Sequence, residues 1–306
     1  MSNYLRHIVL IFRNRQGDRQ DDYTTVIDAD PSNVHFPHIS FDLRLEAANP
    51  YPVGQISITN FHRLGVAALP GGICVIRAGY YRADTWPPVI YAGRTFSIET
   101  DWRGQDSTTT IQLGLPAEFF GEVKLGPLGR PRKLQETLVS QGGSQLQFDR
   151  PNLRDQLQYN GQEIYLPKGY SAGPVPMHEW LTDVLDNKTV GTTHYWQYVP
   201  DDKLHIAYVQ VFHQLRADTR QPIKIYRHNM TGLPSPKLSL DGDTGVDVET
   251  LLDHRLRLSS AVQLEFDDPG RTSGTGFSTW RPVAISHQGD NFTGQFRTQI
   301  SARAIQ

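Results

Sequence analysis

Short segments in which hydrophobic and polar residues alternate recur along the first part of the chain. A period of two is typical of a strand with one buried face, because successive side chains of a strand point to opposite faces. The run Phe41-Asp-Leu-Arg-Leu45 alternates in this way, and residues 72–79 are more apolar, as suits a central strand. The pattern predicts six strands before residue 120, at residues 4–13, 41–45, 55–60, 72–79, 93–99 and 108–113.

Clusters of Gly, Pro, Asn and Asp separate these segments and predict turns between them. The turn signals lie at residues 49–52, 70–72, 86–88 and 103–106. Six short strands at this spacing predict a closed or nearly closed barrel, since closure removes sheet edges that otherwise favour aggregation. We therefore expect an N-terminal β-barrel domain over residues 1–120.

The pattern changes between residues 121 and 221. Apolar residues at helical spacing, with Pro176 suited to an early helical position, predict one main helix near residues 177–186. Residues 132–140 predict a shorter helix, and residues 121–160 otherwise show no clear pattern. The apolar stripe of the main helix consists of Trp180, Leu181, Val184 and Leu185.

Two strand-like segments follow the main helix, at residues 194–199 and 203–212. The residues between them, 200–202, have the composition of a turn, so the pair predicts a β-hairpin. A helix followed by a hairpin predicts a small α+β middle domain over residues 121–221.

The last part of the chain, residues 222–306, returns to strands. Alternating segments occur at residues 245–253, 262–266, 283–290 and 296–300. Turn residues at Pro234-Ser-Pro236 and a hairpin tip at residues 267–276 separate them. This pattern predicts a second β-barrel part at the C-terminus, so the fold class is mainly β with a small α+β insert.

Length and composition agree with a globular protein of two or three domains. The chain has 306 residues, a length too great for one small core. Of these residues, 38% are hydrophobic and 20% are charged. The formal net charge of −2 and the sequence pI of about 6.6 argue against a strongly basic nucleic-acid-binding face. The basic run Gly129–Lys133 is interpreted as a solvated loop, with contact to an anionic partner as the alternative.

The chain has one cysteine, Cys74, so an internal disulfide is excluded. Its apolar surroundings in sequence favour a buried small side chain over a nucleophile, and the absence of disulfides suits folding in a reducing cytoplasm. No segment approaches the roughly 18 apolar residues of a membrane helix, so we expect no membrane anchor. The apolar start of the chain lacks a cleavage site and is interpreted as the first strand instead of a signal peptide.

Motifs that carry known chemistry are missing from the sequence. There is no Gly-x-Ser-x-Gly elbow and no glycine-rich phosphate loop. His178-Glu179 begins a zinc motif, but Thr182 stands where its second histidine belongs. The sequence therefore predicts no catalytic, cofactor-binding or metal-binding residues, no cofactor, and no enzymatic activity.

Three polar segments leave alternatives open. The pair His35 and His38 suits surface or packing roles better than a metal site, because Pro37 prevents a helix between them. The segment 241–247 suits a polar turn better than a calcium loop, since Leu252 stands at the twelfth loop position. The segment 287–290 suits a strand end with a Gly-Asp turn better than a catalytic His/Asp dyad.

Several of these segments together resemble the baseplate hub proteins of phage tails, of the late control protein D type. The resemblance covers about 250 residues by the shared order of short motifs, and residues 121–160 depart from it. It includes the four alternating segments of the last third. Its other motifs are Gln55–Phe61, Gly72–Tyr80, Ile90–Gly93 and Leu166–Tyr170.

The resemblance implies two tail-tube-like β-barrel domains joined by a middle domain, and a homotrimer that forms a ring of pseudo-six-fold symmetry. The ring would join the tail tube protein to the tail tip or spike protein and to other baseplate proteins. It would leave a channel through which DNA passes without specific binding. The expected location is the tail baseplate of the virion, after synthesis in the host cytoplasm.

The resemblance leaves the role of exposed aromatic residues open. Tyr80, Tyr81 and Trp86 are candidates for burial at subunit interfaces, with core packing as an equal alternative. The alternative function is a carbohydrate-binding tail protein that contacts the host surface, in which Trp and Tyr beside Asp would stack on sugars. A tail-associated glycosidase using paired acids such as Asp201-Asp202 or Asp267-Asp268 is a third hypothesis that no motif supports.

Overall fold

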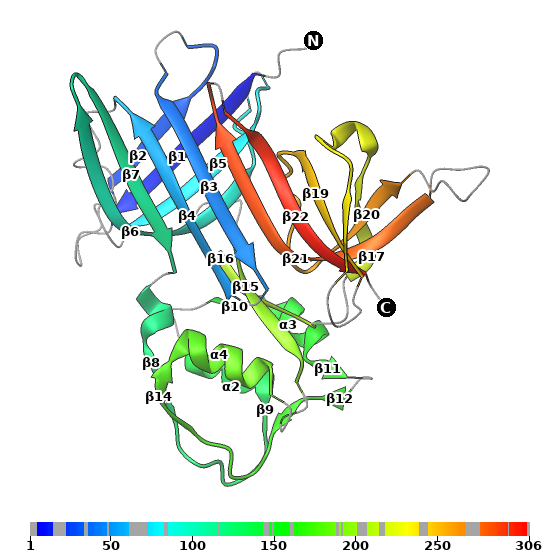
Figure 1. Cartoon of the computed structure of the whole chain (residues 1–306). Coiled ribbons are helices and arrows are strands. Elements are labelled where there is room, and N and C mark those ends of the chain that lie inside the picture. The colour runs from blue at the N-terminus through cyan, green and yellow to red at the C-terminus, as the bar shows by residue number, and fades with distance from the viewer. Residues whose placement is uncertain are drawn as a thin grey trace. The chain divides into compact units, whose positions relative to one another are not determined.

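The described part of the chain forms two compact units (Figure 1). The first unit combines Met1–Gly114 with Ala217–Gln306, and the second consists of Leu115–Arg216. The predicted division into residues 1–120, 121–221 and 222–306 stays a prediction. The computed structural model describes residues 5–14, 23–33, 36–47, 49–60, 72–82, 85–115, 117–142, 147–148, 150–159, 162–187, 190, 192–200, 207–213, 218–238, 244–266, 276–292 and 294–304.

The first unit contains a 13-stranded sheet, so the prediction of a mainly β protein is confirmed. Its strands alternate buried and exposed positions, as in β3, where Ile39, Phe41 and Leu43 point inward. The strands are β1 (Arg6–Asn14), β2 (Tyr23–Ala29), β3 (His38–Glu46), β4 (Asn49–Thr59), β5 (Ile73–Tyr80), β6 (Val89–Arg103), β7 (Asp106–Gly114), β17 (Asp218–Ile225), β18 (Ser235–Leu238), β19 (Thr244–Leu251), β20 (Ser260–Phe266), β21 (Gly276–Asp290) and β22 (Phe296–Ala304).

Two sets of strands in this sheet share one pairing order. In the first set the strands pair in the order β1-β5-β6-β7-β4-β3, and in the second in the order β17-β20-β21-β22-β19-β18. We call the strands β1–β7 the first module and β17–β22 the second module. The modules differ at one step, because β1 pairs antiparallel with β5 whereas β17 pairs parallel with β20. Apart from β2 and the direction of this one pairing, the second module repeats the strand order of the first.

Each module contains one strand of 15 residues that changes partner along its length. The beginning of β6 pairs with β5, and its end pairs with β7. In the same way, the beginning of β21 pairs with β20, while β22 accompanies most of the strand. A bulge lies in the middle of both strands, between Thr95 and Ser97 and between Pro282 and Ala284.

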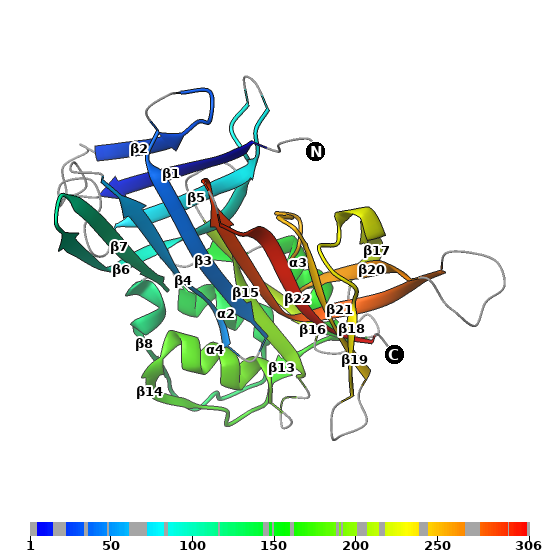
Figure 2. The same ribbon diagram turned by 45° about the horizontal axis from the view of Figure 1, so that its top comes forward.

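The two modules are joined by antiparallel pairing between β3 and the end of β21. This pairing extends from Ser40 opposite Asp290 to Glu46 opposite Ala284. It produces a row of eight neighbouring strands in the order β18-β19-β22-β21-β3-β4-β7-β6 (Figures 1 and 2). The hydrophobic core of the first module reaches across the join, because Phe296 of β22 and Leu252 belong to it.

The predicted closed barrel over residues 1–120 is not found among the described strands. Their pairing follows an open path, because the edge of β3 that would face a closing strand is occupied by β21. The sequence also missed β2, which lies outside the six predicted segments. The apolar run at 73–80 does form a central strand, since β5 lies between β1 and β6.

Two predicted turns are strands. Residues 49–52 begin β4, and Ser235 and Pro236 belong to β18. Because β18 pairs only with β19 in the described sheet, Pro236 lies in an edge strand, where a proline is tolerated. The predicted turns at 70–72 and 267–276 fall largely on residues outside the described ranges. The turn at 103–106 is confirmed: Gly104 adopts a φ of 69° there, a conformation that suits glycine.

The described residues of the second unit form short strands, three α-helices and one short 3-10 helix. The predicted main helix is confirmed as α4 (Met177–Leu185), whose apolar stripe is buried. The other helix near the predicted position is α2 (Leu134–Gly142). The remaining elements are η1 (Ala117–Phe120), β8 (Glu122–Leu125), β9 (Arg132–Lys133), β10 (Gln147–Phe148), α3 (Arg150–Gln156), β11 (Gln158–Tyr159), β12 (Gln162–Glu163), β13 (Tyr165–Leu166), β14 (Ala172–Pro176), β15 (His194–Pro200) and β16 (Ala207–His213).

The predicted hairpin is confirmed as the antiparallel pair β15 and β16, although residues 201–206 of its turn are outside the described ranges. Trp196 of β15 anchors the core of this unit. Its ring stacks on Phe119 with centroids 5.2 Å apart, and its indole Nε1 donates to Thr182 Oγ1 at 3.1 Å. No helix in the described ranges has the length and apolar character needed to cross a membrane.

Gly289 at the join tests how tightly the modules pack. A Cβ at this position would lie 2.2 Å from the ring of Phe41, the residue opposite it on β3. Because that ring is buried in the core, Gly289→Ala should lower the free energy of unfolding by about 1–3 kcal/mol. Urea unfolding followed by circular dichroism measures the change.

Gly232→Ala is the matched control, because no atom lies within 4 Å of a Cβ built there. Its unfolding midpoint should stay close to that of the unmodified protein. If Gly289→Ala and Gly232→Ala proved equally stable, close packing of Phe41 on β21 would be wrong.

Candidate functional site

One face of the eight-strand row is polar, and we call it the polar face. Because inward residues alternate with outward ones, the outward residues of neighbouring strands align in rows across the sheet. The central row crosses six strands, and the pairing register places each member directly opposite the next. Its members are Arg297, Gln288, Asp42, Gln55, Gln112 and Ser97.

Hydrogen bonds link neighbours within this row. Gln288 accepts from Arg297 Nε at 3.2 Å and donates to Asp42 Oδ2 at 3.4 Å, which carries the chain of contacts across the join. In the first module, Gln112 Nε2 donates to Gln55 Oε1 at 3.2 Å. The polar face is therefore continuous from one module to the other.

Acidic residues outnumber basic ones among the described outward residues of this face. Two of its arginines lie next to acids, since Arg44 forms an ion pair with Asp42 at 3.7 Å and Arg103 forms one with Asp101 at 3.0 Å. The face therefore has a net negative charge. Its acidic residues are Asp42, Glu46, Glu99, Asp101, Asp106, Asp247, Glu249 and Asp290, and its arginines are Arg44, Arg94, Arg103, Arg281, Arg297 and Arg303.

Glu249 of β19 shows how hydrogen bonds keep an acid of this face ionised. Partial burial alone would raise its pKa, but hydrogen bonds from Thr231, Arg297 and Gln299 outweigh burial and hold the pKa below its usual value. Arg297 also forms an ion pair with the same carboxylate. The acid is thus ionised at neutral pH, and its charge is largely matched by Arg297.

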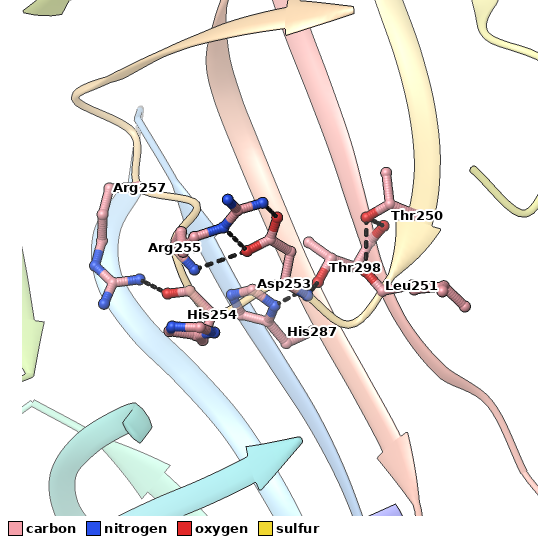
Figure 3. A network of polar contacts seen from close by, with 8 residues as sticks. All are labelled: Thr250, Leu251, Asp253, His254, Arg255, Arg257, His287 and Thr298. Carbon is pink, nitrogen blue, oxygen red and sulfur yellow. Dashed lines mark hydrogen bonds and ion pairs between the residues drawn. The ribbon is translucent and has the colours of Figure 1, made fainter. Parts of the chain in front are cut away.

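On the inner side of the second module, a network of polar contacts connects the loop after β19 to β21 and β22 (Figure 3). Thr298 Oγ1 is its centre. This hydroxyl lies 2.9 Å from His287 Nδ1 and accepts from the backbone N–H of Asp253 at 3.0 Å. The carboxylate of Asp253 accepts two side-chain hydrogen bonds from Arg255, at 2.9 and 2.6 Å, and thereby fixes the loop after β19.

Two pKa shifts follow from this network. Burial lowers the pKa of His287 to about 3, and the nearby Arg257 adds to that effect, so its ring is neutral at physiological pH. Burial would raise the pKa of Asp253, but the hydrogen bonds from Arg255 outweigh it and hold the pKa below its usual value. His287 and Asp253 both help to hold the loop after β19 against β21 and β22.

The structure separates the residues of the suggested His/Asp dyad. His287 points to the inner side of β21, whereas Asp290 lies in the outward register and accepts a contact from His38 Nε2 at 3.0 Å. The favoured interpretation as a strand end is confirmed, because β21 ends at Asp290. Gly289, however, belongs to the strand itself.

The remaining candidate residues from the sequence are Cys74, which is buried in the core, and two possible metal sites that lie partly outside the described ranges. Cys74 is fully buried, and burial raises the pKa of its thiol well above the usual value, so the buried alternative holds. His35 and residues 241–243 lie outside the described ranges, so the metal alternatives at His35 and His38 and at residues 241–247 are not tested. Within the described ranges no group of three or more His, Cys, Asp or Glu could hold a metal ion.

The basic run at 129–133 is only partly a loop. Lys133 belongs to β9, and its Nζ donates to Glu163 Oε1 at 2.9 Å. This hydrogen bond raises the pKa of Lys133 and lowers that of Glu163. Residues 129–131 are exposed and irregular, as the loop interpretation predicts.

The three candidate interface aromatics have different environments. Tyr80 packs edge-on against Phe296 with centroids 5.4 Å apart, which is the core-packing alternative, and Tyr81 lies 5.9 Å from the ring of His7. Trp86 is about half exposed, with the Arg77 guanidinium 5.8 Å from its ring centroid. Tyr80 and Trp86 both line a groove of about 610 Å³, to which Asp253 and Arg255 also contribute.

Sequence reasoning missed the polar face, although its signal was present. Each predicted strand showed outward polar residues, but the register that aligns them arises from pairing between strands far apart in the chain. Gln288 and Asp42, for example, are 246 residues apart in sequence and directly opposite each other in the sheet. Only the order of the strands brings the row together.

Comparison with known proteins gives matches by structure alone. No protein-family profile and no curated protein sequence matches the chain. A tail protein from Neisseria meningitidis MC58 has a TM-score of 0.58 at 9% identity, over 98% of this chain and 97% of its own. The Francisella PdpA–VgrG complex contains a chain with a TM-score of 0.60 at 10% identity, over 98% of this chain and 58% of that one.

A third similar structure is the Escherichia coli c3393 protein. Its TM-score is 0.56 at 9% identity, over 88% of this chain and 74% of its own. It is described as a component of the type VI secretion system with structural similarity to the T4 bacteriophage tail proteins gp27 and gp5. The chain has the fold of phage-tail and type VI secretion proteins. The resemblance found in the sequence is thus confirmed at the level of the fold.

The buried His287 makes stability depend on pH. The unfolded chain binds a proton at this residue below about pH 6.5, whereas the native ring stays neutral down to about 3, so stability falls as the pH drops through that window. The loss should reach about 2 kcal/mol by pH 5. The variant His287→Asn, which cannot titrate, should lose about 2 kcal/mol less between pH 7.5 and pH 5.

Urea unfolding at the two pH values measures both losses. His228→Asn, a change at an exposed histidine, serves as the control and should keep the response of the unmodified protein. Equal losses in all three proteins would show that His287 does not remain neutral in the native state.

Proposed function

We propose that the protein is a structural hub of a phage tail baseplate, in which three copies form a ring between the tail tube and the tip complex. The observation that carries this proposal is the repeated strand order of the two modules within one continuous sheet. The similarity of the fold to phage-tail and type VI secretion proteins supports it. The role is one of assembly and does not require catalysis.

The repeat explains how a three-fold ring could meet a six-fold tube. Three copies of a chain with two similar modules present six similar units around one axis. A closed ring of identical chains uses a head-to-tail interface whose rotation returns to the start. On this proposal, each module is a tail-tube-like domain, and the second unit, residues 115–216, contacts other baseplate proteins.

The polar face is proposed to line the channel of the ring. Tight binding of DNA depends on basic groups that neutralise phosphates, and three arginines of this face, Arg44, Arg103 and Arg297, form ion pairs with acids. A net acidic surface would repel the DNA backbone and allow the duplex to pass. The opposite side of the row packs against the core and is not available for this role.

The proposed place of the ring between tail tube and tip complex also names its protein partners. We propose the tail tube protein on one side of the ring and a tail tip or spike protein on the other, within the baseplate of a virion assembled in the host cytoplasm. Two of the structurally similar proteins support these partners. One is a chain in a PdpA–VgrG complex, and the other is described as structurally similar to gp27 and gp5.

The purified protein should form a homotrimer. Sedimentation equilibrium should give a mass of about 104 kDa, three times the 34.6 kDa of one chain. Negative-stain electron microscopy should show rings with six similar lobes. A monomer at protein concentrations of tens of micromolar, with or without a tail tube protein, would contradict the proposed ring.

The proposed channel lining predicts weak DNA binding that added lysines should strengthen. The double variant Asp42→Lys and Gln112→Lys places two basic residues per copy on the polar face, separated by β4. Duplex DNA held in the channel would then meet six added charges per trimer, which should steepen the dependence of log K on log salt concentration by up to about 5. Fluorescence anisotropy of labelled DNA measures this slope.

The control is Glu136→Lys with Ser140→Lys on helix α2 of the second unit, which changes the net charge by the same amount without altering any residue of the polar face. Its salt dependence should stay near that of the unmodified protein. If the control variant bound DNA as strongly as the polar-face variant, the effect would come from net charge and the proposed channel lining would be wrong.

Carbohydrate binding is a second candidate function, favoured by the groove of the first unit. Tyr80 and Trp86 supply aromatic faces there, beside Asp253 and Arg255. Aromatic rings with adjacent carboxylates are typical of sugar-binding surfaces. A glycan array with the unmodified protein tests this function, and a signal that Trp86→Ala abolishes would favour it over the hub.

A further inference from the structure

In the second unit, two segments of the chain run side by side as a narrow two-stranded ribbon (Figure 1). At one end β8 pairs antiparallel with β14, and at the other end β9 pairs antiparallel with β13. Between these pairs, Gly169 N donates to Leu128 O at 2.8 Å and Leu128 N donates to Tyr170 O at 3.0 Å. Backbone hydrogen bonds thus join the segments 122–133 and 165–176, which together we call the ribbon.

One side of the ribbon packs on helices α2 and α4, and the other side is exposed. In β8 the exposure alternates, so Val123 and Leu125 are buried while Lys124 points outward. Leu166 of β13 is also fully buried. Because apolar side chains fix the inner side, the outer side is left to polar residues and to glycine and proline.

A proline and a glycine turn restrict the backbone of the outer residues. Pro131 holds the residue before it, Arg130, in an extended conformation. Lys168 lies at the tip of the turn 167–170, which a backbone hydrogen bond of 3.2 Å closes. Gly169 adopts a φ of 84° in that turn, a conformation that glycine tolerates. The two cations are therefore presented from a backbone of limited freedom.

The ribbon is basic although the chain as a whole is slightly acidic. It contains five basic residues and one acid, Glu122, whereas the formal net charge of the chain is −2. One of the five, Lys133, is neutralised by Glu163, whose Oε2 lies 2.7 Å from its Nζ. The side chains of the other four are exposed and form no hydrogen bond or ion pair with any residue of the described ranges. These four residues are Lys124, Arg130, Arg132 and Lys168, and we call them the basic patch.

The pairing register brings basic residues of both segments together. Arg132 lies directly opposite Leu166, and Leu128 is held by the two backbone hydrogen bonds given above. Arg130 and Lys168 lie between these bonded positions, on opposite segments. Like charges held close to one another repel, so a negatively charged ligand at this place relieves the repulsion.

We propose that the basic patch binds an acidic segment of a partner protein, whose carboxylates contact the four basic side chains. The proposal rests on the contact with other baseplate proteins that the proposed function assigns to the second unit, and it names the chemistry of that contact. Arginine suits such a site because its planar guanidinium forms two parallel hydrogen bonds with one carboxylate. Lysine adds a point charge on a flexible stem, which adapts to carboxylates in several positions.

The dimensions of the basic patch suit a short extended segment. Lys124 and Arg132 are eight residues apart, which corresponds to at most about 26 Å at the rise of a strand. A partner segment of about eight residues in extended conformation has the same length. Because hydrogen bonds already hold the backbone of the ribbon, binding orders little more than its side chains.

Other anionic partners fit the ribbon less well. Proteins that bind duplex DNA commonly make about six to ten phosphate contacts, more than the basic patch offers. Single-stranded nucleic acids stack their bases on aromatic rings, and residues 126–131 and 167–169 contain no aromatic residue. Binding to a bilayer surface uses large exposed apolar side chains. The one large apolar residue in these two ranges is Leu128, which is half-buried.

Zero-length cross-linking tests where an acidic segment binds. The full-length protein is mixed with a biotin-labelled peptide of about eight residues in which glutamate and serine alternate. A carbodiimide then joins the carboxylates of the peptide to adjacent lysine amines. Mass spectrometry should find the peptide on Lys124 and Lys168 at a yield at least about fivefold above that on Lys224 of β17, an exposed lysine outside the ribbon. Equal yields on Lys168 and Lys224 would overturn the proposal.

The pair Lys133 and Glu163 is an internal reference for this experiment. Lys133 Nζ lies 2.9 Å from Glu163 Oε1, so the carbodiimide should join the two side chains with or without the peptide. Peptide attached to Lys133 as often as to Lys168 would contradict the assignment of binding to the four residues of the basic patch.

Removal of charge tests the same site through affinity. Arg130→Gln with Arg132→Gln should weaken binding of a fluorescein-labelled peptide of the same sequence by about fivefold or more, because two exposed charge pairs are lost. Fluorescence anisotropy measures the affinity. Circular dichroism should show that the variant remains folded, since both side chains are exposed.

The matched control is Arg82→Gln with Arg154→Gln, which removes two exposed arginines outside the ribbon. It changes the net charge by the same amount and should change the affinity by less than about twofold, because salt screens distant exposed charges. An equal loss of affinity in the two double variants would mean that the peptide responds to net charge, and the basic patch would be wrong.

Two further probes distinguish the class of partner. A short DNA duplex and vesicles that contain phosphatidylglycerol should both bind more weakly than the peptide. If either probe bound more tightly than the peptide and lost its affinity in Arg130→Gln with Arg132→Gln, the acidic protein segment would be the wrong occupant.

These outcomes are separate from the test of the ring. A trimer in sedimentation whose basic patch shows no preference for the peptide overturns this proposal and leaves the hub intact. A monomer that carries the peptide on Lys124 and Lys168 contradicts the ring and supports the basic patch. A trimer that carries the peptide on these two lysines supports both.

Discussion

The antiparallel pairing of β3 with the end of β21 is the interaction on which the rest of the first unit depends. It converts two sets of strands, which are separated in sequence by the whole second unit, into one sheet. It also fixes the register, so that the outward residues of both modules align, and it places Phe41 over Gly289 in a shared core. A slip of one residue would turn every side chain of a module to the opposite face.

The two faces of the row differ in burial and polarity, and the register at the join keeps inward and outward residues on separate faces. On the inner side, even polar residues serve packing: His287, Thr298 and Asp253 satisfy one another and close the loop after β19 (Figure 3). On the outer side, polar residues form hydrogen bonds along the sheet while keeping a net negative charge. A polar group buried without a partner costs free energy, so the buried polar groups of the inner side pair with one another, whereas the side chains of the outer row are half-buried or exposed.

Local patterns in the sequence predicted much of the secondary structure, and the failures have physical causes. Alternation identified β3 and β22, an apolar run identified β5, and the stripe of Trp180 and Leu181 identified α4, because each signal lies within one element. Strand β4 begins at two prolines that read as a turn, and Pro236 is tolerated because β18 is an edge strand. The closed barrel failed because β3 pairs with β21, a partner that no local pattern indicates. The polar face and the repeated strand order stayed hidden for the same reason, since both are properties of pairing between distant segments.

Open sheet edges favour pairing with other chains, and both ends of the described row carry features that limit such pairing. The edge of β6 carries Glu99 and Asp101, so two copies of it would bring like charges together. The edge of β18 is only four residues long and contains Pro236, which limits the backbone bonds available to an arbitrary strand.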